Sequence, residues 1–176
     1  MKELTLEITN YCPHSCPYCS SDTTKDRFAA IILELVTIQN NLDSLTDNKT
    51  NLFDRINISG GEPLSHPQFY DILLLCKKYS KSVALYTNAI EWIFFNANVI
   101  DGVTIDANLT VKPNTNNIHI LKRISQGREN KRPETIYSKN FDKTNPCNKC
   151  EQCNHIYIRP NGKKANGPCD KYNYKE

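Results

Sequence analysis

Apolar runs of two kinds alternate along this chain. Short runs of β-branched and other apolar residues predict strands, and longer segments in which apolar residues recur every three or four positions predict amphipathic helices. Strands are predicted at residues 4–9, 55–59, 82–88, 102–111 and 134–141. Helices are predicted at residues 27–42, 66–79, 91–98 and 116–127. This alternation predicts an α/β fold with a parallel sheet or a partial barrel.

The predicted strands keep one polar face, which a parallel sheet covered by helices on both sides would not have. Side chains at alternate positions of a strand share a face. The polar positions are Thr5, Glu7 and Thr9 in the first strand, Asn57 and Ser59 in the second, and Thr104, Asp106 and Asn108 in the fourth. A curved sheet with helices outside and a polar cavity inside explains the pattern, with Glu7 and Asn57 lining the cavity. The prediction is a partial (β/α) barrel of about five to six parallel strands, because a closed barrel needs eight.

The length of 176 residues suits one domain with a small appendage. We place the partial barrel at residues 1–142 and a cysteine-rich extension at residues 143–176. A formal net charge of +3 gives no strong indication of a nucleic-acid partner. The opening MKELTLEITN lacks the apolar core of a signal peptide, and no apolar run approaches the ~20 residues that span a membrane. We therefore expect a cytoplasmic protein without a membrane partner.

Eight cysteines in a reducing compartment are more often metal ligands than disulfides. Cys12, Cys16 and Cys19 follow the first predicted strand with the spacing C-x3-C-x2-C. Three thiolates can hold three irons of a [4Fe-4S] cluster and leave the fourth iron open, since a fully ligated cluster takes four cysteines. A zinc site made of these cysteines and His14 is the alternative. Cys76 stands alone in a predicted helix and is expected to be a buried small hydrophobe.

A second motif follows the second predicted strand: Gly60, Gly61, Glu62 and Pro63. With C-x3-C-x2-C after the first strand, and with Tyr18 before the third cysteine, the chain resembles the radical S-adenosylmethionine (SAM) superfamily over roughly residues 4 to 140. The resemblance implies that SAM occupies the open iron of a [4Fe-4S] cluster. It implies reductive cleavage of SAM to a 5′-deoxyadenosyl radical, which abstracts hydrogen from a substrate, in an enzyme of oxidoreductase or lyase type.

The resemblance also implies roles for individual residues. Gly60, Gly61 and Glu62 would meet the SAM amino group, and Pro63 would fix the turn. The candidate SAM-binding residues are Tyr18, Gly60, Gly61, Glu62, Pro63, Thr87, Asn88, Asp106 and Ser138. Polar groups at strand ends can equally bond local backbone, which is the alternative for the last four. His14 would then have no ligand role, no catalytic residue is assigned, and flavodoxin or ferredoxin would supply the electron.

The C-terminal region carries a second set of cysteines. Cys147, Cys150 and Cys153 have the spacing C-x2-C-x2-C, and Cys169 follows a predicted hairpin, IYIRPNGKKANGP. Four thiolates would hold a second, fully ligated [4Fe-4S] cluster. The region resembles the auxiliary-cluster extensions called SPASM and twitch, although those place two ligands on each side of the hairpin. A four-cysteine zinc site is the alternative, and His155 could replace one cysteine.

The resemblance to SPASM-like extensions favours a peptide or protein substrate. Three alternatives stay open: an activase that installs a glycyl radical on a partner enzyme, an enzyme acting on a nucleoside or other small molecule, and a metal-binding interaction module without catalysis. The intact Gly60-Gly61-Glu62-Pro63 motif beside C-x3-C-x2-C argues against the module, because a scaffold has no use for a SAM-binding site.

Overall fold

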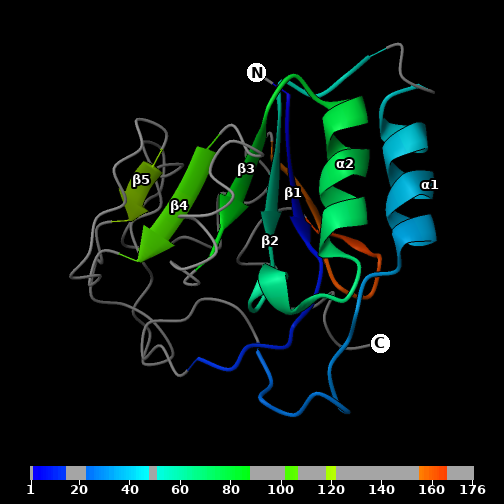
Figure 1. The fold of residues 1–176 in the computed structure, drawn as a ribbon. Coiled ribbons are helices and arrows are strands. Elements are labelled where there is room, and N and C mark those ends of the chain that lie inside the picture. The colour runs from blue at the N-terminus through cyan, green and yellow to red at the C-terminus, as the bar shows by residue number, and fades with distance from the viewer. Residues whose placement is uncertain are drawn as a thin grey trace, which may run out of the picture.

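The described strands form a single seven-stranded sheet in this computed structural model (Figure 1). The structure describes residues 2–14, 23–47, 51–87, 102–106, 118–121 and 155–165. For residues 102–106 and 118–121 and for His155 it describes the backbone alone.

The sheet is parallel except at one edge. Its strands are β1 (Glu3–Glu7), β2 (Arg55–Ser59), β3 (Val83–Tyr86), β4 (Gly102–Asp106), β5 (Ile118–Leu121), β6 (His155–Ile158) and β7 (Lys164–Ala165). They lie in the order β5-β4-β3-β2-β1-β6-β7, and only β7 is antiparallel to its neighbour. The α/β class is confirmed, the sheet is mixed, and the partial barrel stays a prediction.

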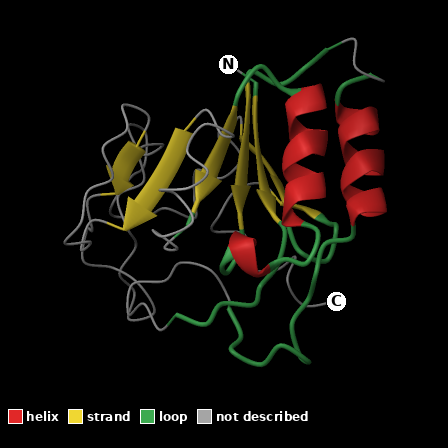
Figure 2. Ribbon diagram, in the orientation of Figure 1, coloured by secondary structure: helices red, strands yellow, loops and turns green. Residues whose placement is uncertain are grey.

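Two helices cover one face of the sheet (Figures 1 and 2). They are α1 (Leu35–Leu45) and α2 (Phe69–Tyr79), and a 3-10 turn, η1 (Pro63–Ser65), precedes α2. The alternate strand residues that face them are apolar and buried, and this packing forms the core: Leu4, Leu6, Ile8, Ile56, Ile58, Val83 and Leu85 against Ile38, Leu42, Ile72, Leu73, Cys76 and Tyr79. Cys76 is fully buried, as expected, and burial raises the pKa of its thiol. None of the described helices is long and apolar enough to cross a membrane.

The strand prediction at 55–59 is confirmed to the residue, and β1, β3 and β4 lie within or beside their predicted ranges. The predicted helix at 116–127 is wrong where the structure describes it, because residues 118–121 form β5 and pair with β4. Isoleucines at alternate positions favour a strand as well as a helix in so short a segment. The predicted helix 91–98 and strand 134–141 lie outside the described residues.

The predicted helix at 27–42 begins eight positions later than expected, at Leu35. Residues 31–33 instead pair with the chain that follows β1: the Leu33 N–H donates to the Ile8 carbonyl at 2.9 Å and the Asn10 N–H donates to the Ile31 carbonyl at 3.1 Å. The Asn10 side chain also accepts the Ile31 N–H at 2.7 Å. A long-range backbone pairing therefore overrides a helical apolar pattern in this segment.

The hairpin predicted near the C-terminus is present as β6 and β7. It is part of the main sheet, because β6 lies parallel to β1, opposite β2 (Figure 1). The hairpin thus pairs with a strand about 150 positions earlier in the sequence, and local patterns could not predict this pairing.

Candidate functional site

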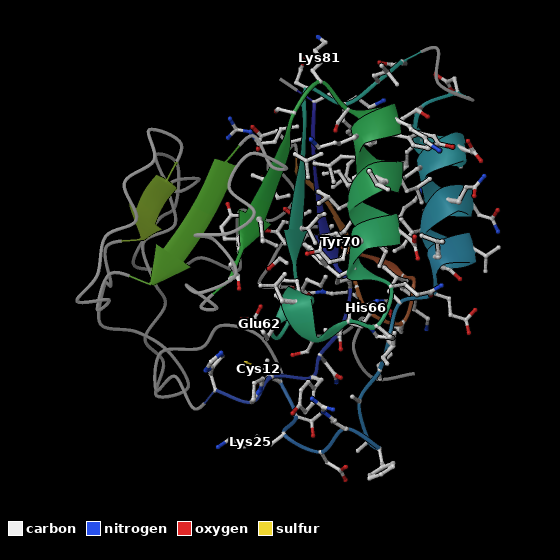
Figure 3. All side chains as sticks on the ribbon, viewed as in Figure 1. Cys12, Lys25, Glu62, His66, Tyr70 and Lys81 are labelled. Carbon is white, nitrogen blue, oxygen red and sulfur yellow. The ribbon has the colours of Figure 1, made fainter. Side chains whose placement is uncertain are left out.

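The candidate site lies where β1, β2 and β3 end. Figure 3 shows Cys12 and Glu62 near one end of the sheet and Lys81 at the other. Cys12 lies in the segment after β1, Glu62 in the segment after β2, and Thr87 directly after β3. The carboxyl ends of parallel strands are the usual place for ligand sites in α/β proteins.

The glycine motif lies directly against the segment that leads into Cys12. The Gly61 N–H donates to the Thr9 carbonyl at 2.6 Å, and the Glu62 N–H donates to the Tyr11 carbonyl at 2.8 Å. A Cβ on Gly60 would lie 2.4 Å from the Thr9 oxygen, and Gly60 has a φ of +147°, which side chains rarely tolerate. The two motifs are therefore joined by main-chain hydrogen bonds that only glycines permit.

The Glu62 carboxylate is buried and connects the ends of several elements. Its Oε1 accepts the Thr87 hydroxyl at 2.7 Å and the Leu64 N–H at 3.1 Å, which caps η1. Its Oε2 lies 3.8 Å from Nε2 of His14 in the cysteine segment. Two of the predicted SAM-binding residues, Glu62 and Thr87, are thus in direct contact, and their binding role stays a prediction.

The segment between β1 and α1, residues 8–34, is called here the cysteine loop. Its two ends are held together by the pairing of residues 8–10 with 31–33. Further along, the Cys12 N–H donates to the Thr24 carbonyl and the Thr24 N–H donates to the Asn10 carbonyl, both at 2.9 Å. The Cys12 side chain is 8% exposed, so it is nearly buried at the start of the loop.

His66 ties the segment after β2 to the same loop. It is buried; its Nε2 lies 3.2 Å from the Leu33 carbonyl oxygen, and its Nδ1 accepts the Gln68 N–H at 3.0 Å. This arrangement requires a neutral ring with the proton on Nε2. Burial lowers the pKa of His66.

The polar face predicted for the strands is buried. Thr5, Glu7 and Asn57 lie opposite the apolar face that packs on the helices, and none of them is more than 5% exposed. An ion pair lies on this face: Nη1 of Arg159, directly after β6, lies 2.7 Å from Oε2 of Glu7 in β1. Sequence reasoning did not single out Arg159, although Glu7 on the buried polar face of β1 signals the need for a cationic partner.

Several predicted residues lie outside the described part of the chain: Cys16, Tyr18, Cys19, Asn88, Ser138, Cys147, Cys150, Cys153 and Cys169. Asp106 is the last residue of β4, so its backbone lies at the carboxyl ends of the parallel strands, as the candidate site does. The side chain of Asp106 is not described.

The Cys12 thiol and the Glu62 carboxylate, at the carboxyl ends of the strands, fit the iron–sulfur cluster and the SAM that the motifs imply. A thiol held almost out of solvent at the start of the loop suits a soft metal centre, and a carboxylate fixed by two hydrogen bonds beside it suits an amino group. The fold and the site together define an α/β protein with a candidate ligand site at the carboxyl ends of its parallel strands.

The chain belongs to the radical SAM superfamily, whose family model matches residues 6–125 of the 176. This match includes both motifs. Membership implies a [4Fe-4S] cluster and SAM as the cofactors.

Curated relatives match about half of this chain. The PqqA peptide cyclase of Methylorubrum extorquens (strain PA1) is 37% identical over 87 residues, which are 49% of this chain and 21% of the relative. The PqqA peptide cyclases of Bradyrhizobium diazoefficiens and Streptomyces rochei are 34% identical over 89 residues and 30% identical over 87 residues. These matches cover 48% and 49% of this chain and 20% and 23% of those relatives. The matched segment thus spans about a fifth of the length of these relatives.

Two solved structures share the fold. The crystal structure of BtrN in complex with AdoMet and 2-DOIA has a TM-score of 0.61 and 15% identity, covering 100% of this chain and 76% of that one. The structure of BtrN in an open conformation has a TM-score of 0.57 and 13% identity, covering 99% and 72%. At these identities the likeness concerns the fold alone.

Proposed function

We propose that this chain binds a [4Fe-4S] cluster through Cys12, Cys16 and Cys19 and uses SAM to begin radical chemistry on a peptide or protein. The observation that carries the proposal is the contact between the two motifs, in which the Glu62 N–H bonds to the carbonyl of Tyr11, the residue before Cys12. A ligand bridging the thiolate-held metal and the Glu62 carboxylate would meet both motifs at once. When bound and reduced, the cluster supplies one electron that cleaves SAM to methionine and a 5′-deoxyadenosyl radical.

The protein's own residues position the reactants. Gly60 and Gly61 let the segment after β2 approach the cysteine loop, so that Cys12 and Glu62 stay in a fixed relation. Thr87 and the Leu64 N–H orient the Glu62 carboxylate, which would accept hydrogen bonds from the SAM amino group. Cys12 and Glu62 are nearly excluded from solvent, and exclusion of water from this region would protect a reactive intermediate from quenching.

A peptide substrate is supported by the PqqA peptide cyclases that match 49% of the chain. Glycyl-radical activation and small-molecule chemistry are the competing alternatives, and deuterium transfer from a labelled substrate distinguishes among them. A deuterated candidate peptide that transfers deuterium into 5′-deoxyadenosine would identify the substrate class, and any peptide encoded beside this gene is the first to test.

A second metal site formed by Cys147, Cys150, Cys153 and Cys169 is part of the proposal. Cys153 precedes β6 by two residues, and Cys169 follows β7 by four. Because β6 and β7 are antiparallel neighbours, the first residue of β6 and the last residue of β7 lie at the same open end of the hairpin. That connection supports a shared site, with zinc as the alternative metal.

The test of the main proposal is SAM cleavage. Anaerobically reconstituted, dithionite-reduced protein should convert SAM slowly to 5′-deoxyadenosine even without substrate, as measured by chromatography. Cys16→Ala should abolish the product. Glu62→Gln should retain iron and weaken SAM binding by about tenfold or more, because it removes a charged acceptor. Wild-type protein with a full, reducible cluster that yields no 5′-deoxyadenosine would overturn the enzymatic proposal in favour of a metal-binding module.

A further inference from the structure

The hairpin β6–β7 contacts the first end of the cysteine loop through a buried ion pair. Arg159 and Glu7 are 2% and 4% exposed, and their side chains meet at 2.7 Å. Glu7 is the last residue of β1, and the loop begins at the next residue, Ile8. The Arg159 side chain therefore holds the position from which the loop departs.

The turn of the same hairpin contacts the second end of the loop. Gly162, with a φ of +79°, lies so close to the start of α1 that a Cβ there would be 2.9 Å from Cγ2 of Thr37 and 3.8 Å from Cδ1 of Leu33. The Leu33 N–H bonds to the Ile8 carbonyl and closes the loop. Figure 1 shows the hairpin, coloured orange, beside β1 and near the lower ends of the two helices.

We propose that the hairpin β6–β7 clamps both ends of the cysteine loop, and that Arg159 is a positioning residue that sets the placement of Cys12 relative to Glu62. The physical basis is connectivity. The main-chain hydrogen bonds that join the two motifs are accepted by the carbonyls of Thr9 and Tyr11, which lie two and four residues beyond Glu7. A shift of Glu7 would be passed directly to these carbonyls.

The buried ion pair makes the clamp sensitive to substitution. Removing Arg159 takes the cationic partner away from the buried Glu7 carboxylate, which costs far more than losing an exposed pair. The chain contains a matched exposed pair, because Nζ of Lys81 also lies 2.7 Å from Oδ1 of Asp54, at the opposite end of the sheet (Figure 3). Lys81→Met therefore serves as the control for Arg159→Met.

The experiment is amide hydrogen exchange, measured by mass spectrometry, on the metal-free chain of 176 residues. In Arg159→Met, amides of residues 8–12, 31–33 and 61–62 should exchange about tenfold faster than in the wild type, while those of α2 change by less than about twofold. Lys81→Met should leave all these segments within about twofold of the wild type. If Arg159→Met does not fold, Gly162→Asn tests the other contact. Asn tolerates the positive φ of this position, whereas its Cβ would meet Cγ2 of Thr37 at 2.9 Å, so the turn should move away from α1 and residues 31–33 should loosen selectively.

Equal acceleration of exchange in the cysteine loop and in α2 would overturn the clamp. So would the absence of acceleration in both Arg159→Met and Gly162→Asn. A second measurement, on reconstituted protein, connects the clamp to the proposed function, on which this inference rests. Arg159→Met should keep its iron yet bind SAM at least about tenfold more weakly than Lys81→Met, and equal affinities would count against the positioning role. If wild-type protein does not bind SAM at all, the proposed function fails while the exchange result still decides the clamp.

Discussion

At the scale of single residues, the glycine motif has a structural reason that precedes any ligand. We expected Gly60 and Gly61 to let the main chain approach SAM. Their backbones approach the protein's own chain: a Cβ on Gly61 would lie 2.2 Å from the Tyr11 carbonyl oxygen and 2.9 Å from Cβ of Cys12. The glycines therefore hold the cysteine loop and Glu62 together.

Gly61→Ala should therefore be strongly destabilising. The added Cβ meets fixed backbone atoms, so the free energy of unfolding should fall by about 3 kcal/mol. Urea unfolding at pH 7 measures this change. Gly162→Ala is the control, because its Cβ meets a side-chain carbon, Cγ2 of Thr37, rather than backbone atoms, and this contact and the positive φ together should cost about 1 kcal/mol. An equal loss in the two variants would show that the close approach at Gly61 is not tight.

At the scale of elements, the cysteine loop is shaped by its neighbours rather than by its own pattern. Residues 27–34 carry apolar positions at helical spacing, yet Asn10, Ile8 and His66 bind the backbone of Ile31 and Leu33 in an extended arrangement. Each of these bonds satisfies a backbone group that a helix would also have satisfied. Exposed Phe28 shows that the apolar pattern in this stretch does not lead to a buried helix face.

His66 makes the attachment of this loop dependent on pH. Because burial lowers the pKa of folded His66, while the unfolded chain titrates near the ordinary value of about 6.5, the unfolded state takes up its proton first as the pH falls. The contribution is complete above about pH 6.5 and is lost as the pH falls from there toward the folded pKa, at up to about 1.4 kcal/mol per pH unit.

Urea unfolding at pH 7.5 and 5.5 should show this dependence. The wild type should lose more than His66→Asn over this range, by up to about 1.4 kcal/mol, because Asn keeps an acceptor for the Gln68 N–H but cannot titrate. If both proteins lose the same free energy of unfolding, His66 is not held neutral in the folded state.

At the scale of the whole molecule, the first strand of the chain pairs with a strand far along the sequence. β6 occupies the edge of β1 that lies opposite β2, so the hairpin completes the sheet beside the candidate site. The division at residue 142 into barrel and extension stays a prediction. The hairpin belongs to the predicted extension, and its strand β6 pairs with β1 of the predicted barrel. A metal bound by the cysteines that flank the hairpin β6–β7 would stabilise the hairpin, and through the proposed clamp it would also stabilise the cysteine loop.

Metal content tests the two-site proposal for the molecule as a whole. Reconstituted protein should carry about eight irons, four for each cluster. Replacing Cys12, Cys16 and Cys19 together with Ala should leave about half of the iron, measured by colorimetric assay and mass spectrometry. Cys76→Ala is the matched control and should keep all of it, because its thiol is fully buried within α2. About four irons and one tightly bound zinc in the wild type would replace the second cluster by a zinc site.

The sequence by itself determined the features that depend on near neighbours. Strand β2, the α/β class, the buried Cys76 and the spacing of the cysteine and glycine motifs all follow from patterns within a few residues. Only the tertiary structure decided that α1 starts at Leu35, that residues 118–121 form a strand, that β6 pairs with β1 and that Arg159 neutralises Glu7. The physical reason is that a hydrogen bond or ion pair between distant segments depends on where the whole chain passes, and local periodicity does not encode that path.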